Sequence, residues 1–146
     1  MPEYGREYWE QHQVDRRLSK EQLLEIAQEH SLRENRLVKN ARDYFFVDTE
    51  AITTYLFSMY YHEAADPRLE QLAQQSRQRY DLFLLCESDF PYDDTWDRSG
   101  EVSRQIFQRR IMSELVRRKI PFTQVRGTVS ERIRQVEEIL AAFEKY

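Results

Sequence analysis

An acidic residue stands at the end of a short apolar segment, where a carboxylate could do chemistry. Residues 44–47 read Tyr-Phe-Phe-Val and are followed directly by Asp48 and Thr49. An aromatic run of this kind predicts a strand over residues 44–48, with Asp48 at its carboxyl end. A carboxylate there can hold Mg²⁺ against the phosphates of a nucleotide, directly or through water. Because a helix is expected to follow at once, Asp48 could instead cap that helix, or serve both roles.

The glycine-rich loop that usually accompanies such an acid does not occur in this sequence. No stretch matches G-x-x-x-x-G-K-[ST], whose backbone N–H groups and lysine cradle the phosphates of ATP. The three glycines are Gly5, Gly100 and Gly127, and none precedes a Lys-Ser or Lys-Thr pair. We therefore expect this chain alone to bind ATP poorly.

Composition favours a globular protein and argues against some classes of partner. Hydrophobic residues make up 40% of the chain, and the net charge of −4 makes nucleic acid an improbable main partner. Cys86 is the only cysteine, so no internal disulfide can form, and its apolar neighbours predict a buried thiol. We find no signal peptide and no apolar run near the roughly 20 residues that span a bilayer. A cytoplasmic location without membrane attachment is expected.

Helical and apolar segments alternate along the chain and must position these residues. Strands are predicted over residues 44–48, 80–86 and 121–125, and capping boxes at Ser19 and Thr128 predict two helix starts. Strands separated by helices predict an α/β fold with a parallel sheet and flanking helices, formed as one domain over residues 1–146. Ligands of such sheets bind beyond the carboxyl ends of the strands. This rule gathers four acids at one rim: Glu3, Asp48, Glu87 and Asp89.

Several short motifs follow one another in order: Glu3-Tyr4-Gly5-Arg6-Glu7-Tyr8, Phe46-Val47-Asp48-Thr49, Tyr80-Asp81-Leu82, Asp89-Phe90-Pro91-Tyr92 with Arg98, Pro121-Phe122, and Gly127 with Glu131-Arg132. Together they resemble the ribosylnicotinamide kinase domain of bacterial NadR proteins, within the P-loop kinase superfamily. The resemblance covers essentially all 146 residues. It implies a P-loop kinase that uses Mg²⁺ and ATP to phosphorylate the 5′-hydroxyl of nicotinamide riboside, which gives nicotinamide mononucleotide in NAD salvage.

Two departures from that family affect what we expect of this chain. Family members carry the Lys-Ser loop just upstream of the point where this chain begins, so we expect an N-terminally incomplete domain that is inactive in isolation. Such a domain would lack the first strand and expose strand edges, so we expect it to be poorly folded, to form a homo-oligomer, or to be closed by direct pairing of the two neighbouring strands. The resemblance also allows an adenylyltransferase or regulatory domain upstream. The second departure is in the lid, where Thr95-Trp96-Asp97-Arg98 replaces the usual Asp-Gly-x-Arg.

The resemblance implies a role for each candidate residue. Asp48 would hold the metal, Glu3 would orient or deprotonate the attacking hydroxyl, and Arg98 would stabilise charge on the transferring phosphoryl group. The substrate-binding residues would be Tyr4, Arg6, Glu7 and Tyr8, with the two tyrosines stacking on the cationic nicotinamide ring. Simpler readings remain open, because Glu3 can be an ordinary loop carboxylate, the tyrosines can be core residues, and Arg6 can pair with Glu3 or Glu7.

Two other functions compete with this interpretation. A non-catalytic α/β module that binds a nucleotide or a protein would explain the absent phosphate loop. A related nucleoside kinase with another substrate would differ only in the pocket formed by residues 3–8.

Overall fold

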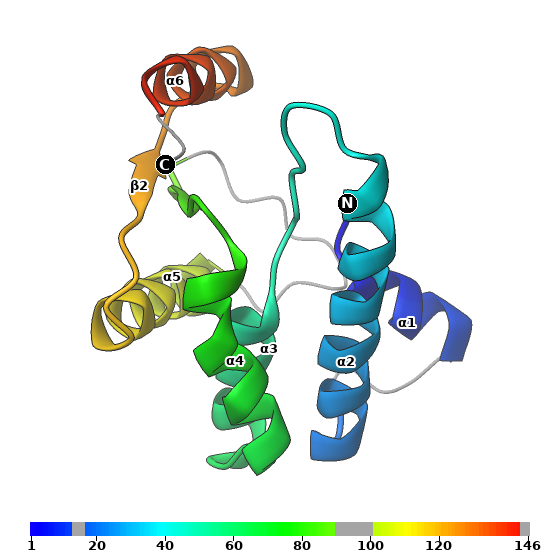
Figure 1. Ribbon diagram of the computed structural model, residues 1–146. Coiled ribbons are helices and arrows are strands. Elements are labelled where there is room, and N and C mark those ends of the chain that lie inside the picture. The colour runs from blue at the N-terminus through cyan, green and yellow to red at the C-terminus, as the bar shows by residue number, and fades with distance from the viewer. Residues whose placement is uncertain (13–16, 90–100, 144–146) are drawn as a thin grey trace. The chain divides into compact units, whose positions relative to one another are not determined.

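The structure, a computed structural model, describes residues 1–12, 17–89 and 101–143 (Figure 1). These residues form two compact units, Met1–Ser76 and Arg77–Tyr146, and each is described by itself. In the described part of the chain the first unit is helical, and the second holds a two-stranded parallel sheet with helices. The predicted α/β class with a parallel sheet is therefore confirmed at this level. Among the described residues, no helix is long and apolar enough to cross a membrane.

The first unit is built from a long helix and the helices that pack on it. Its elements are α1 (Tyr4–His12), α2 (Lys20–Leu37), the 3₁₀ turn η1 (Val38–Asn40), α3 (Ala51–His62) and most of α4 (Pro67–Arg79). The predicted capping box at the start of α2 is confirmed. Ser19 Oγ accepts a hydrogen bond from the Gln22 N–H, and the Gln22 side chain accepts one from the Ser19 N–H.

The core of this unit lies along α2. One cluster joins α2 to α4 through Leu23, Leu24, Ala27 and Leu69, and partly buried side chains of α3 pack against it. A second cluster joins α1 to α2 through Tyr4, Tyr8 and Ile26. Burying a leucine side chain stabilises a fold by about 1.5–3 kcal/mol before entropy costs are subtracted. The second cluster fixes α1, and with it the segment that carries the motif of residues 3–8, on the surface of α2.

The prediction of a strand over residues 44–48 is wrong, because these residues make a single β-type rung rather than a ladder. The Met1 amino group donates to the Phe46 carbonyl, and the Asp48 N–H donates to the Met1 carbonyl at 2.9 Å. This alternation around one residue is the pattern of a parallel bridge. Tyr44 and Phe46 are about half exposed, at 53% and 54%. The apolar run was read correctly, but a strand also needs neighbours along its whole length.

The second unit is organised around two short parallel strands. Its elements are β1 (Leu84–Cys86), α5 (Glu101–Arg117), β2 (Thr123–Val125) and α6 (Val129–Ala142). The strands pair in register, with Leu84 opposite Thr123 and Cys86 opposite Val125. Both are shorter than the predicted strands over residues 80–86 and 121–125. The parallel direction was predictable, because a helix separates the two strands in the sequence.

Burial within the second unit corrects one expectation. Leu85, Leu115, Ile120 and Val125 are buried, whereas Cys86 is exposed. Because side chains alternate along a strand, a three-residue strand that buries its middle residue turns its last side chain away from the core. The predicted buried thiol at Cys86 is therefore wrong.

Candidate functional site

Asp48 lies in a tight turn between the bridged segment and α3, and its carboxylate is exposed. Within the described ranges, no hydrogen bond or ion pair engages that carboxylate. The helix cap for which sequence offered Asp48 is provided by Glu50 instead. Glu50 Oε2 accepts from the Ile52 N–H at 2.8 Å, and Oε1 accepts from the Thr53 N–H at 3.3 Å. The capping alternative for Asp48 is therefore wrong, and its carboxylate is left for another use.

The backbone of this turn is strained and closely held. Thr49 adopts φ 61°, which is rare for a β-branched residue and costs roughly 1–3 kcal/mol. The Asp48 N–H is bound by the Met1 carbonyl, and the Asp48 carbonyl faces His30 Nε2 at 3.4 Å. Strain of this size persists only where the surroundings define the conformation, and such positions concentrate at functional sites.

Glu50 anchors the far side of the turn to α4. Ser76 Oγ donates to Glu50 Oε2 at 2.6 Å, in addition to the two helix N–H groups. Burial raises the pKa of the Glu50 carboxyl, while the hydrogen bonds from Ser76, Ile52 and Thr53 act in the opposite direction. Glu50 is thus a structural acid that ties the start of α3 to the end of α4, next to an acid that is exposed.

The structure brings Glu3 into the neighbourhood of Asp48 by way of Met1. Glu3 lies two residues after the Met1 group that binds the Asp48 N–H, and it directly precedes α1. A methyl group added at Gly5 would lie 3.4 Å from Glu3 Oε1, so the Glu3 side chain leans over the first turn of the helix. Two of the three predicted catalytic residues, Glu3 and Asp48, therefore lie in segments of the first unit that are joined by a backbone hydrogen bond.

The predicted substrate residues of α1 are largely engaged with α2. Tyr4 and Tyr8 are only 7% and 3% exposed, and the Arg33 guanidinium lies over the Tyr4 ring at 4.1 Å. Arg33 also binds the Glu7 carboxylate, which lowers the pKa of Glu7. Among the four predicted substrate residues, Arg6 is the exposed one. The motif thus serves first to hold α1 in place.

Tyr8 contacts one side chain of α2 and one of its own helix, α1. Its hydroxyl donates to Glu25 Oε2 at 2.8 Å, and its ring stacks on His12 at 4.2 Å between centroids. Burial, followed by the hydrogen bond to Glu25, raises the pKa of Tyr8 to about 12. The shift extends the pH range over which the phenol keeps its proton and donates to Glu25.

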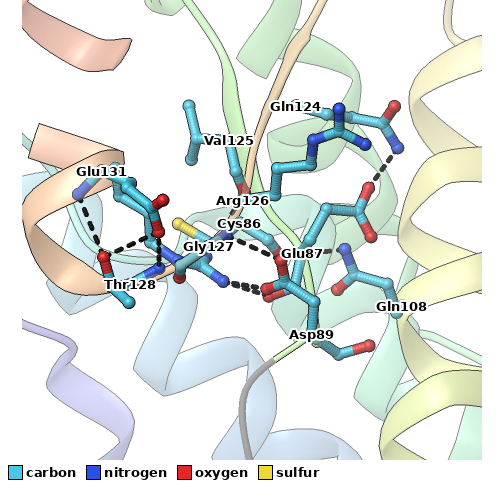
Figure 2. Close-up of polar contacts among 12 residues, drawn as sticks. Cys86, Glu87, Asp89, Gln108, Gln124, Val125, Arg126, Gly127, Thr128 and Glu131 are labelled. Atoms are coloured by element: carbon cyan, nitrogen blue, oxygen red, sulfur yellow. Dashed lines mark hydrogen bonds and ion pairs between the residues drawn. The ribbon is translucent and has the colours of Figure 1, made fainter. Parts of the chain in front are cut away.

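A second acidic group lies at the carboxyl end of the β1–β2 sheet, where Figure 2 shows its contacts. Asp89 Oδ2 accepts from the Gly127 N–H at 2.7 Å, and Asp89 also pairs with Arg132. The Gly127 N–H is the main cause that lowers the pKa of Asp89, and the charge of Arg132 adds to it. The Glu87 carboxylate accepts from the Gln124 side chain. The predicted position of Glu87 and Asp89 beyond a strand end is confirmed.

Arg132 joins the loops that follow β1 and β2. Its guanidinium donates to the carbonyls of Glu87 at 2.9 Å, Gly127 at 2.8 Å and Val125 at 3.3 Å. Sequence reasoning included Arg132 in a motif but gave it no role. Its signal was its place just after the Thr128 capping box, since an arginine in a first helical turn lies close to the carbonyls of the preceding loop.

Gly127 is required by the geometry of that loop. It adopts φ 89°, and a methyl group built there would lie 2.5 Å from Glu131 Oε2. Glu131 and Thr128 form the capping box that starts α6, which confirms the prediction for this helix. The glycine therefore allows its own N–H to face Asp89 while Glu131 closes the helix end.

Some predicted or overlooked residues need separate mention. Arg98 lies outside the described residues, as do the other three positions of the predicted lid, Thr95, Trp96 and Asp97. His30 was given no chemistry from sequence, although its spacing from Glu34 is that of neighbours on one helix face. In the described ranges, no group of three or more His, Cys, Asp or Glu side chains is arranged to hold a metal ion. A Mg²⁺ ion that has one protein carboxylate and several phosphate or water oxygens needs no such group.

Comparison with known proteins gives one match. The family model described as AAA domain matches residues 1–132, which is most of the chain. In the same comparison, no curated protein and no solved structure matches this chain.

Proposed function

This chain belongs to the AAA domain family, which is P-loop NTPase-like, and from that premise we propose that it serves as a Mg²⁺- and ATP-dependent ribosylnicotinamide kinase. The observation that carries the proposal is Asp48. Its carboxylate is exposed and unpaired among the described residues, while its backbone is held in a strained turn. An unneutralised acid on an anchored backbone next to a helix start fits a metal-binding role in phosphoryl transfer.

The donor chemistry of this turn fits magnesium. A hard cation prefers carboxylate, phosphate and water oxygens, and Asp48 offers a carboxylate without a competing cation among the described side chains. When bound with ATP, Mg²⁺ neutralises charge on the β- and γ-phosphates. Asp48 would hold it directly or through water, and the anchored backbone would fix the point from which the side chain reaches the ion.

Glu3 would act on the substrate hydroxyl. In the proposed reaction the 5′-oxygen of nicotinamide riboside bonds to the γ-phosphorus, and the bond from that phosphorus to the β–γ bridging oxygen breaks to release ADP. Glu3 would orient the hydroxyl and accept its proton. Arg98 is assigned to the transferring phosphoryl group by resemblance alone. The product is nicotinamide mononucleotide.

The substrate class rests on the motif of residues 3–8. The contacts of Tyr4 and Tyr8 with α2 support a role in holding α1 in place, and Arg6 is the exposed residue of the motif. Nicotinamide riboside carries a cationic ring, and its recognition by this motif is proposed on the resemblance, since Tyr8 and Glu7 are engaged by Glu25 and Arg33. A single kinase domain over residues 1–146, a cytoplasmic location and a homo-oligomer remain parts of this proposal, as does an upstream domain.

The test is a transfer assay on the full-length natural protein. γ-Labelled ATP and nicotinamide riboside are supplied with Mg²⁺, and labelled nicotinamide mononucleotide is measured for the wild type and Asp48→Asn. The matched control is Asp43→Asn, which removes another exposed acid five residues earlier. We expect product from the wild type and the control but hardly any from Asp48→Asn. Full activity of Asp48→Asn would remove this residue from the mechanism.

A non-catalytic nucleotide-binding module is the second candidate, because no G-x-x-x-x-G-K-[ST] pattern occurs in the sequence. Calorimetry with ATP and a non-hydrolysable analogue distinguishes the two. Magnesium-dependent nucleotide binding without transfer to any nucleoside would favour the module.

A further inference from the structure

A buried polar pair on α2 lies directly behind the Asp48 turn. His30 is 5% exposed and Glu34, one helical turn later, is 4% exposed. His30 Nδ1 lies 2.8 Å from Glu34 Oε1, which fixes the plane of the imidazole ring. The opposite nitrogen, Nε2, then points out of α2 toward the Asp48 carbonyl oxygen at 3.4 Å. Both facing atoms are oxygens that accept hydrogen bonds, so the ring donates in both contacts when each of its nitrogens carries a hydrogen.

We propose that His30, oriented by Glu34, is a positioning residue that sets the direction of the Asp48 carboxylate for metal binding. This inference rests on the proposed function. The peptide plane between Asp48 and Thr49 is defined by where its carbonyl points, and His30 faces that carbonyl. The Met1 carbonyl holds the N–H on the other side of Asp48. Fixing both peptide groups leaves the Asp48 side chain with few directions.

The strained backbone at Thr49 requires neighbouring contacts of this kind to keep its conformation. A threonine at φ 61° relaxes to an ordinary conformation unless its neighbours prevent it. Glu50 holds the residue after it through the cap of α3 and the bond from Ser76. His30 and Met1 hold the residue before it. The strained residue thus lies between two anchored ones, and the anchor on the Asp48 side is the one nearest to the metal-binding group.

The chemistry of the pair also favours positioning over stability. Buried hydrogen-bonded charged or polar pairs often add no stability over apolar side chains of similar volume, whereas groups that orient a metal ligand matter strongly for metal affinity. The same unit offers a comparison. His62 also faces a backbone carbonyl, that of Leu18 at 2.7 Å, but this contact is made away from the Asp48 turn.

The experiment compares four variants of the full-length natural protein. His30→Leu removes the ring nitrogens, His30→Gln restores an N–H with similar reach, Glu34→Ala leaves the ring without its orienting partner, and His62→Leu is the matched control. For each we measure thermal unfolding, the Mg²⁺ concentration that gives half-maximal rate, kcat, and the KM for nicotinamide riboside. His30→Leu and Glu34→Ala should raise the required Mg²⁺ concentration by about tenfold or more, the scale typical of groups that orient a metal ligand.

The expected pattern separates positioning from folding. The KM for nicotinamide riboside should change little in each variant. In His30→Gln the Mg²⁺ concentration for half-maximal rate should return close to the wild-type value. His62→Leu should lower the melting temperature and leave that Mg²⁺ concentration unchanged. If His30→Leu does not fold, the other two variants still test the positioning role. Glu34→Ala should raise the Mg²⁺ concentration for half-maximal rate, and His30→Gln should not.

The outcomes also separate this inference from the proposed function. If Asp48→Asn abolishes transfer but His30→Leu and Glu34→Ala match His62→Leu in Mg²⁺ dependence, the positioning role is wrong while the kinase proposal stands. If Asp48→Asn is fully active, the metal-binding role of Asp48 is wrong and the positioning inference is overturned with it.

Discussion

Two acids in this molecule follow short apolar segments, yet they end in opposite states. The Asp48 carboxylate is exposed and unpaired among the described residues, and only the backbone around it is anchored. The Asp89 carboxylate is bound by the Gly127 N–H and by Arg132. An apolar run followed by an acid therefore does not define a functional carboxylate. The residues that reach the acid from distant parts of the sequence decide whether its charge is already neutralised.

The difference follows from which group of each acid is restrained. At Asp89 the side chain itself accepts charge-assisted hydrogen bonds, which occupy both oxygens and join two loops. At Asp48 the restraints fall on the peptide groups, so the side chain keeps its charge and its lone pairs. The first arrangement stabilises a loop junction, and the second prepares a ligand for a cation.

The largest expected effect is a loss of turnover when the exposed acid, Asp48, is neutralised. Asp48→Asn should lower turnover by roughly 10²-fold or more, the scale of losing one electrostatic group from a transition state. Its melting temperature should stay close to that of the wild type, because the carboxylate has no partner among the described residues. The paired variant Asp89→Asn should show the reverse, a lower stability of the second unit with a smaller change in turnover. Steady-state kinetics and thermal unfolding of both variants decide the point.

The next effect concerns the arginine that neutralises Asp89. Arg132→Ala removes an ion pair and the donors to three backbone carbonyls, so the free energy of unfolding should fall by about 2–3 kcal/mol. Hydrogen exchange of the β1 and β2 amides reports the loss within the second unit. Arg134→Ala, at an exposed position on the same helix, is the control and should leave that exchange unchanged.

A glycine swap sharpens the comparison further. Gly127→Ala places a methyl group 2.5 Å from Glu131 Oε2 in a backbone with φ 89°. The left-handed conformation and the disturbed cap together should cost about 2 kcal/mol. Urea unfolding measures the change, and Gly5→Ala, whose added methyl would meet Glu3 only at 3.4 Å, is the milder partner. Equal stability of the two variants would contradict the role given to Gly127.

The opposite swap at the Asp48 turn should have the opposite sign for stability. Thr49→Gly removes a side chain from a left-handed position and should raise the free energy of unfolding by up to about 1 kcal/mol. Turnover should fall at the same time, because a freer turn holds Asp48 less firmly. An increase in both stability and turnover would show that the strain at Thr49 has no functional purpose.

The smallest effect is the pH response of the first unit. The folded-state pKa of Tyr8 is raised from 10.0 to about 12, so the folded state retains the phenol proton longer than the unfolded state does. Its contribution to stability is fully present below pH 10 and is lost as the pH rises toward about 12. Tyr8→Phe should flatten this part of the stability profile. Chemical unfolding at a series of alkaline pH values measures it, and an unchanged slope in Tyr8→Phe would assign the alkaline loss to other groups.

Local signals were predictable where the responsible atoms are close in sequence. The capping boxes at Ser19 and Thr128 involve residues three positions apart, and both were found. The parallel direction of β1 and β2 followed from the helix between them. By contrast, the strand over residues 44–48 failed, because the number of rungs depends on neighbours that the local sequence does not specify.

In the candidate site, too, some residues could be identified from the local sequence and others could not. Asp48 could be singled out from its position after an apolar run, and Glu50 was missed as the cap because Asp48 and Thr49 are more usual capping types. The burial of Tyr4 depends on Arg33, which is distant in sequence and covers its ring. No role for His30 was predicted, since the role of a histidine depends on the groups that contact its two ring nitrogens, here Glu34 and the Asp48 carbonyl.

By itself, the sequence determined that this protein has an α/β fold with parallel strand pairing, that two of its helices start at capping boxes, and that an acid follows the run at residues 44–47. Those features depend on side-chain periodicity and on contacts within one helical turn. Only the tertiary structure decided which acid keeps its charge. That choice depends on residues such as Arg132, Gly127 and His30, which reach an acid from other elements, and long-range contacts of this kind exist only once the chain has folded.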